Sequence, residues 1–157
     1  MPAPSTRVVV VTGGSAGIGR AAVEELVARG HRVVTCARDG DRLAEAVAGL
    51  PGVTAISADM ADAADRARLV ETTLAGHGRI DAVVLNAGLG WAGLVEDMPG
   101  EAVDGIVAVN LTGALELTRL ALPHLLAAAR DRGRADVVAM SSVAAWSQVP
   151  PLIVYSA

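Results

Sequence analysis

The feature that most constrains the fold is a regular alternation of short β-branched runs with longer helical stretches. Four consecutive valines at residues 8–11 form the first run, as expected for a strand that is buried on both faces of a parallel sheet. Further strands are predicted at residues 32–36, 53–57, 82–85 and 136–140, and helices at residues 17–29, 42–50 and 63–75. This alternation is typical of βαβ units, and it predicts one doubly wound α/β domain with a parallel sheet over residues 1–157.

A longer apolar stripe between residues 103 and 125 repeats every three to four residues and predicts a long amphipathic helix. Pro123 lies inside this stripe, so we expect a kink or a new turn there. Residues 141–157 contain two adjacent prolines and many small residues, and they are predicted to be loop-like.

The composition excludes several classes of protein. Hydrophobic residues make up 52% of the 157 residues and the net charge is −4, which excludes a disordered chain and disfavours nucleic-acid binding. No uninterrupted apolar run approaches the roughly 18 residues of a membrane span, so no membrane partner is expected. No signal peptide is visible and Cys36 is the single cysteine, which predicts a cytoplasmic location. The three histidines lack metal-ligand spacing, so no metal site is expected.

A glycine-rich loop, TGGSAGIG at residues 12–19, lies between the first predicted strand and the first predicted helix. Glycines permit a tight turn and a close approach of the backbone to a pyrophosphate, and the N–H groups of the following helix attract the anion. A glycine-rich turn without a ligand is the alternative. The position of the loop after a strand and before a helix favours dinucleotide binding.

This loop resembles the TGxxxGIG loop of the classical short-chain dehydrogenase/reductase family. Tyr155 follows Ser142 by 13 residues, which is the offset usual in that family. The further marks of the family occur in its order along nearly the whole chain, and they are Asp59, Asn86, Ala87, Gly88, Asn110, Ser142 and Tyr155.

The resemblance implies a Rossmann fold and an NAD(P)-dependent oxidoreductase that interconverts a secondary alcohol and a ketone. It implies that Tyr155 transfers the proton, that Ser142 polarises the substrate carbonyl, and that Asn110 orders a proton-relay water. Taken alone, Asn110 is also compatible with a structural residue at a helix kink, and the other two with turn and packing residues. The cofactor-binding residues that the resemblance implies are Gly13, Ser15, Gly17, Ile18, Gly19, Arg38, Asp59, Met60, Asn86, Ala87 and Gly88.

The end of the second predicted strand bears on the type of cofactor. An acidic side chain there binds a ribose 2′-OH, whereas an arginine accommodates a 2′-phosphate. Ala37 stands where the acid would be and Arg38 follows, which resembles the NADP-preferring pattern. Asp39 is either an NAD-binding acid or the N-cap of the next helix. We therefore expect NADP(H) in preference to NAD(H).

One part of the family pattern is missing. The family's tyrosine works with a lysine four residues later, and all 13 basic residues of this chain are arginines. The family also has further strands, without which the sheet is incomplete at its C-terminal edge. We therefore expect the chain to be the N-terminal part of a homodimeric or homotetrameric enzyme that acts on a small carbonyl or alcohol. A non-catalytic nucleotide-binding module is the alternative.

Overall fold

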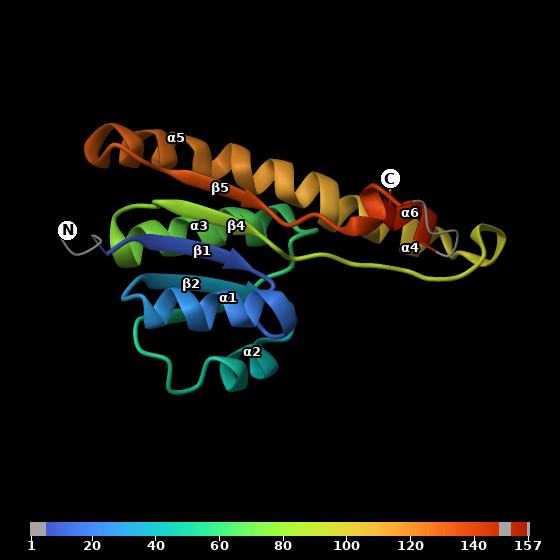
Figure 1. Cartoon of the computed structure of the whole chain (residues 1–157), viewed down its shortest axis with the longest axis horizontal. Coiled ribbons are helices and arrows are strands. Elements are labelled where there is room, and N and C mark those ends of the chain that lie inside the picture. The colour runs from blue at the N-terminus through green and yellow to red at the C-terminus, as the bar shows by residue number, and fades with distance from the viewer. Residues whose placement is uncertain (1–5, 148–151, 157) are drawn as a thin grey trace.

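The computed structural model describes residues 6–147 and 152–156. This part of the chain forms a five-stranded, fully parallel sheet in the order β3-β2-β1-β4-β5 (Figure 1). The strands are β1 (Val8–Thr12), β2 (Arg32–Ala37), β3 (Val53–Ser57), β4 (Ala82–Leu85) and β5 (Asp136–Ala139). The strand order reverses at β1, because the chain leaves β3 at one edge and returns as β4 on the other side of β1. Such a reversal opens a crevice at the carboxyl ends of the strands.

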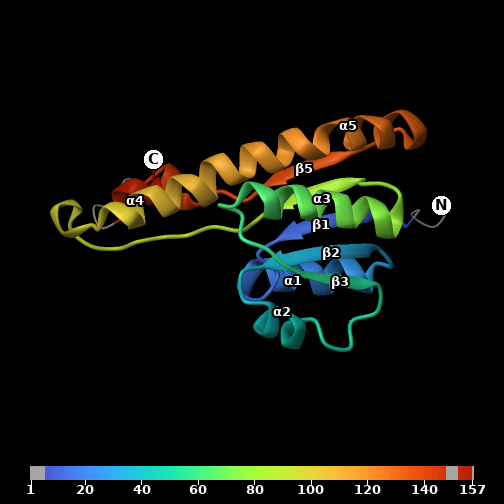
Figure 2. The same ribbon diagram turned by 180° about the vertical axis from the view of Figure 1, so that it is seen from behind.

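Helices cover both faces of this sheet (Figure 2). On one face lie α1 (Gly17–Ala28) and α2 (Gly40–Ala46), and on the other lie α3 (Ala63–His77) and α5 (Ala114–Arg132). The predicted doubly wound α/β fold is therefore confirmed.

The valine run of β1 forms the centre of two cores, because successive side chains of a strand point to opposite faces. Val9 and Val11 pack in one cluster with Val23 of α1 and Leu43 of α2. Val10 packs in the other cluster, whose members from the helices include Leu69 of α3 and Leu117 of α5. The uninterrupted apolar run is thus explained by burial on both faces.

The strands predicted at residues 53–57 and 82–85 coincide with β3 and β4, whereas several other elements differ at their ends. The helix predicted at residues 42–50 is wrong in both limits, since α2 spans Gly40–Ala46. It begins earlier because the Asp39 side chain accepts a hydrogen bond from the Arg42 backbone N–H at 2.9 Å. The N-cap alternative for Asp39 is therefore the one observed.

A continuous helical stretch runs through α4 (Gly100–Ile106), a π-helical segment η2 (Val107–Gly113) and α5. No new turn begins at Pro123, since α5 continues through this residue. Pro123 is exposed, so water can hydrate the carbonyl group that it leaves unbonded. The departure from α-helical geometry falls at η2 instead, and η2 contains Asn110.

By length and composition alone, the 33-residue stretch from Gly100 to Arg132 could cross a membrane, since it contains an 18-residue window with a mean hydropathy of 1.3. Core helices of soluble proteins meet the same criterion, and Val109, Leu117 and Leu125 of this stretch belong to the core beside α3. Charged residues such as Glu116 interrupt the apolar sequence of this stretch, so it contains no uninterrupted apolar run of the roughly 18 residues that a membrane span needs.

The region predicted to be loop-like after residue 140 contains two short helical turns in its described part, which corrects that prediction. They are η3 (Val143–Ala145) and α6 (Ile153–Ser156), and α6 packs against η3 and α4. The Ser142 side chain starts η3 by accepting a hydrogen bond from the Ala144 backbone N–H at 3.2 Å. Residues 148–151, which include the two prolines, lie outside the described residues.

In the described structure β5 forms an edge of the sheet, as the sequence predicts. Val137 and Val138 of this strand are exposed, and so are Leu111 and Leu115 of the long helix. Exposed apolar surface of this kind is typical of a face that packs against another element or another chain.

A charged network joins β1, β4 and β5 at their amino ends. Asp81 is almost fully buried, accepts a hydrogen bond from the Val8 backbone N–H at 2.7 Å, and pairs with Arg79. Arg7 donates to the Asp81 carbonyl at 2.7 Å and forms an ion pair with Asp136 at 2.6 Å. These contacts fix the three strands at the end of the sheet that is opposite the carboxyl-end crevice.

The buried thiol of Cys36 predicts a pH-dependent stability. Burial raises the pKa of this thiol from 9.0 to about 12. Between these values the unfolded chain loses a proton that the folded chain keeps, so the free energy of unfolding falls as the pH rises. The expected slope is up to about 1.4 kcal/mol per pH unit above pH 9. Urea denaturation between pH 8 and 10 measures this slope, and Cys36→Ala should remove it. An unchanged slope in Cys36→Ala would contradict the prediction.

Candidate functional site

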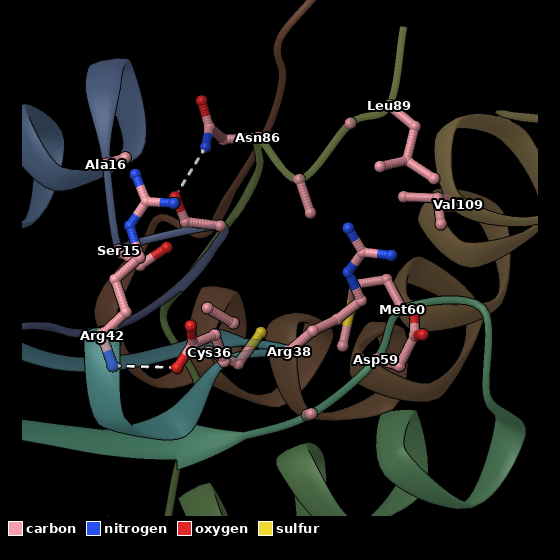
Figure 3. Close-up of a pocket in the computed structure, with 16 residues that line it drawn as sticks. Ser15, Ala16, Cys36, Arg38, Arg42, Asp59, Met60, Asn86, Leu89 and Val109 are labelled. Carbon is pink, nitrogen blue, oxygen red and sulfur yellow. Dashed lines mark hydrogen bonds between the residues drawn. The ribbon is translucent and has the colours of Figure 1, made fainter. Parts of the chain in front are cut away.

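A cleft of about 350 Å³ opens at the carboxyl ends of the strands (Figure 3). Four segments at the ends of the strands β1, β2, β3 and β4 line it, together with one residue of η2. Open α/β sheets bind their ligands at this edge, beside the point where the strand order reverses. The cleft is therefore the first candidate for a functional site.

The glycine loop forms one wall and is held by the end of β2. The backbone N–H groups of Gly13 and Gly14 donate to the Cys36 carbonyl at 2.8 and 3.1 Å. Gly14 has no room for a side chain, since a Cβ there would lie 1.9 Å from Thr35 Oγ1. The N-cap of α1 is Ala16, which supplies no side-chain hydrogen bond to the helix. The first N–H groups of α1 are thus suited to an anion such as a pyrophosphate.

The glycine loop and the turn after β4 interlock through Thr12 and Asn86. Thr12 Oγ1 accepts hydrogen bonds from the backbone N–H groups of Asn86 and Ala87, both at 2.9 Å. In return, Asn86 Nδ2 donates to the carbonyl groups of Thr12 at 2.9 Å and Gly13 at 3.3 Å. Gly19 of α1 fits tightly beside them, since a Cβ there would lie 2.2 Å from the Gly13 carbonyl oxygen.

The segment after β3 supplies a carboxylate and part of an apolar wall. Asp59 is half-buried, and its Oδ1 accepts a hydrogen bond from the Ala61 backbone N–H at 2.9 Å. Met60 lines the cleft together with Leu89 and Val109 (Figure 3). This arrangement suits a flat aromatic base, because the apolar wall can contact its face and the carboxylate can accept from an amino group.

Two arginines follow β2, and their side chains point to different parts of the cleft (Figure 3). Arg38 extends toward Met60 and Val109, whereas Arg42 reaches toward Ser15 of the glycine loop. Asp39 lies between them in the sequence and caps α2. Arg42 was not predicted from the sequence, although its place four residues after Arg38, in the first turn of α2, was a usable signal.

The three predicted catalytic residues lie outside this cleft. Asn110 in η2 binds the segment after β4: its Oδ1 accepts from the Leu89 backbone N–H at 2.8 Å, and its Nδ2 donates to the Leu89 carbonyl at 2.9 Å. These contacts satisfy the side chain, as expected for a structural asparagine, and its water-ordering role stays a prediction. Tyr155 on α6 is half-buried beside Gly90, where a Cβ would lie 3.7 Å from its ring. Ser142 Oγ is engaged with η3.

The structure brings most of the predicted cofactor-binding residues together. Three of them do not line the cleft: Gly17 faces a second groove, Ile18 is exposed, and Gly19 packs behind the loop. No hydrogen bond joins Asn110, Ser142 and Tyr155 to one another among the described residues. The predicted residues that line the cleft are Gly13, Ser15, Arg38, Asp59, Met60, Asn86, Ala87 and Gly88.

The apolar cleft residues Leu89 and Val109 were not predicted from the sequence either. They lie on a loop and on η2 respectively, and no local pattern distinguishes them from ordinary core residues. In the part of the chain that the structure describes, no group of three or more His, Cys, Asp or Glu side chains could hold a metal ion.

The parallel sheet with helices on both faces and a cleft at the strand reversal defines a Rossmann-fold α/β protein. A family model described as short chain dehydrogenase matches residues 7–157. The chain therefore belongs to the short-chain dehydrogenase/reductase family. The members of this family that are similar to this chain are dehydrogenases and reductases.

Individual relatives agree with this assignment. An 11-beta-hydroxysteroid dehydrogenase-like protein 4A of Arabidopsis thaliana is 35% identical over 159 residues, covering 96% of this chain and 51% of that protein. The chain thus spans about half the length of the curated relatives it matches. A 3-ketoacyl-(acyl-carrier-protein) reductase from Brucella melitensis, solved with NADH, superposes with a TM-score of 0.91 at 28% identity, covering 96% of this chain and 62% of that chain. A metagenomic short-chain oxidoreductase solved with NADP superposes with a TM-score of 0.85 at 35% identity. The match covers 97% of this chain and 68% of that chain.

The tight fit of Gly19 predicts that Gly19→Ala disrupts nucleotide binding. The added methyl group would push the Gly13 carbonyl and Asn86 apart, at a cost of about 1–3 kcal/mol. We expect the dissociation constants of NADH and NADPH to rise about tenfold or more, as measured by calorimetry. Gly76→Ala is the matched control, because Gly76 lies in α3 with open space around it. Equal affinities of the two variants would contradict the prediction.

Proposed function

We propose that the protein containing this chain is an NADP(H)-dependent oxidoreductase that interconverts a secondary alcohol and a ketone. The observation that carries the proposal is the continuity of the cleft: it runs from the glycine loop to Leu89, which Asn110 binds on its other side. The glycines that leave no room for side chains and the free N–H groups at the start of α1 fit the pyrophosphate of a dinucleotide.

Each predicted catalytic residue has a role in this proposal. When bound, the reduced nicotinamide would supply a hydride to the carbonyl carbon of the substrate. Tyr155 would donate its phenolic proton to the carbonyl oxygen, so that the alcohol forms. Ser142 Oγ–H would donate a hydrogen bond to the same oxygen, and Asn110 would order the water that returns a proton to Tyr155. In the oxidative direction Tyr155 would accept the proton instead.

The cofactor preference is proposed from the residues after β2, because similar structures hold both NADH and NADP. Arg38 and Arg42 place two guanidinium groups along the cleft, and guanidinium pairs well with phosphate. The Asp39 carboxylate is engaged as the cap of α2, which supports NADP(H) over the alternative of Asp39 as a ribose-binding acid.

We also propose a substrate class, a cellular location and an oligomeric state for the protein. A small-molecule alcohol or carbonyl compound is its substrate class, with no nucleic acid or membrane as partner. The single buried Cys36 supports a cytoplasmic location. The exposed apolar residues Leu111 and Leu115 on the long helix support a homodimer or homotetramer.

Tyr155→Phe tests the reaction in the full-length protein. We expect NADPH oxidation with a panel of ketones to slow by about 10²–10⁴-fold, because the variant lacks the transferable proton. The affinity for NADPH, measured separately by fluorescence, should stay unchanged. A wild-type rate in Tyr155→Phe would remove this residue from its role. Nucleotide binding without any turnover in the unaltered protein would favour the non-catalytic module.

Arg38→Asp tests the cofactor preference. The substitution replaces a phosphate-binding cation by an acid suited to a ribose 2′-OH, so the preference for NADPH over NADH should fall about 10- to 100-fold. Dissociation constants for both nucleotides give this ratio. Arg29→Asp makes the same charge change at an exposed position just after the C-terminus of α1, away from the glycine loop. It should leave the ratio of the two dissociation constants unchanged. An unchanged ratio in Arg38→Asp would exclude Arg38 from phosphate recognition.

A further inference from the structure

The first turn of α3 holds the cleft segment after β3 from behind. Asp65 accepts a hydrogen bond from the Asp59 backbone N–H, with Oδ2 at 2.7 Å from that nitrogen. This bond is the main reason why the pKa of the Asp65 carboxyl lies below its usual value. Arg66 donates from its guanidinium to the Met60 carbonyl at 2.6 Å. Two adjacent helix residues therefore fix two peptide units of the cleft wall, Ala58–Asp59 and Met60–Ala61.

Arg66 is an unusual residue for a protein core. It is only 5% exposed, it forms no ion pair with any described residue, and its Nε has no hydrogen-bond partner there. The charge of Arg66 does contribute, after Arg119, to the lowered pKa of the Glu116 carboxyl, but the two side chains form no ion pair. Burying a charge without a directly paired counter-charge is unfavourable, and apolar replacements of buried ion pairs are often neutral or stabilising. Stability alone therefore does not account for an arginine at this position.

The contact of Arg66 reaches the Asp59 carboxylate through one rigid peptide unit. The carbonyl of the Met60–Ala61 peptide accepts from Arg66, and the N–H of the same peptide donates to Asp59 Oδ1 at 2.9 Å. A peptide unit is planar, so fixing its carbonyl also fixes the direction of its N–H. Arg66 is thereby linked to the Asp59 carboxylate through two hydrogen bonds and one peptide unit, although it does not line the cleft itself.

We propose that Arg66, with Asp65 beside it, is a positioning residue that sets the base selectivity of the nucleotide site. The inference rests on the proposed function and on Asp59 accepting a hydrogen bond from the exocyclic amino group of the adenine of a bound nucleotide. Hypoxanthine has a carbonyl oxygen at that position, which a carboxylate cannot bind. A correctly directed Asp59 therefore favours adenine, and a misdirected one does not distinguish the two bases.

The test compares NADPH with its deamino analogue, in which hypoxanthine replaces adenine, as ligands of the full chain. The readout is the dissociation constant of the deamino analogue divided by that of NADPH, so a high ratio means a preference for adenine. We expect Arg66→Met to lower the preference for adenine about tenfold without lowering Tm, since the variant loses a charged hydrogen bond but also a buried charge. Arg66→Lys retains a donor and should recover part of the preference. An unchanged ratio in Arg66→Met would overturn the proposal.

Two further variants separate positioning from helix stability. Asp62 is the N-cap of α3, and its carboxylate accepts a hydrogen bond from the Asp65 backbone N–H at 2.8 Å. Asp62→Ala removes this cap and should lower Tm without changing the ratio of dissociation constants. A loss of selectivity in Asp62→Ala equal to that in Arg66→Met would also overturn the proposal. Asp65→Ala releases the Asp59 backbone and should lower the ratio, which keeps the test decisive if Arg66→Met does not fold. Failure of the unaltered chain to bind either nucleotide would instead overturn the proposed function.

Discussion

The cleft depends on the hydrogen-bonded interlock between Thr12 at the end of β1 and Asn86 after β4. These two strands lie side by side where the strand order reverses, and their following segments diverge to opposite faces of the sheet. The hydroxyl of Thr12 satisfies two backbone N–H groups, and the amide of Asn86 satisfies two carbonyls. The walls of the cleft are thus fixed before any ligand arrives, which lowers the entropy that binding must overcome.

The long helix provides a second support for the same cleft. In the π-helical segment η2, Asn110 binds both backbone groups of Leu89, and Gly113 approaches Met60 so closely that a Cβ would lie 2.5 Å from its carbonyl oxygen. The Met60 carbonyl also accepts from the buried Arg66. The segments after β3 and β4 are therefore both tied to η2, and the cleft wall is held from the side of the sheet that bears α3 and α5.

Sequence patterns predicted the elements better than their ends and their irregularities. The valine run of β1 and the alternation that follows it specify a parallel sheet, because only burial on both faces accounts for such a run. The limits of α2 depended on whether Asp39 caps a helix or binds a ligand, and both interpretations suit an aspartate at that place. Pro123 was expected to mark the irregularity of the long helix, but an exposed proline leaves its unpaired carbonyl to water, and the irregularity follows the contacts of η2 instead.

The sequence by itself determined the fold class, the family resemblance and the strand ends at which polar residues gather. The fold class follows from hydrophobic periodicity, and the resemblance follows from short motifs that match those of the family. Both are local features of the chain. Tertiary structure alone decided which side chains share the cleft: it turned Arg42 toward the glycine loop and placed Leu89 and Val109 on one wall. It also buried Arg66 behind Met60. These contacts join residues on different elements, and their distances exist only after the sheet has brought those elements together.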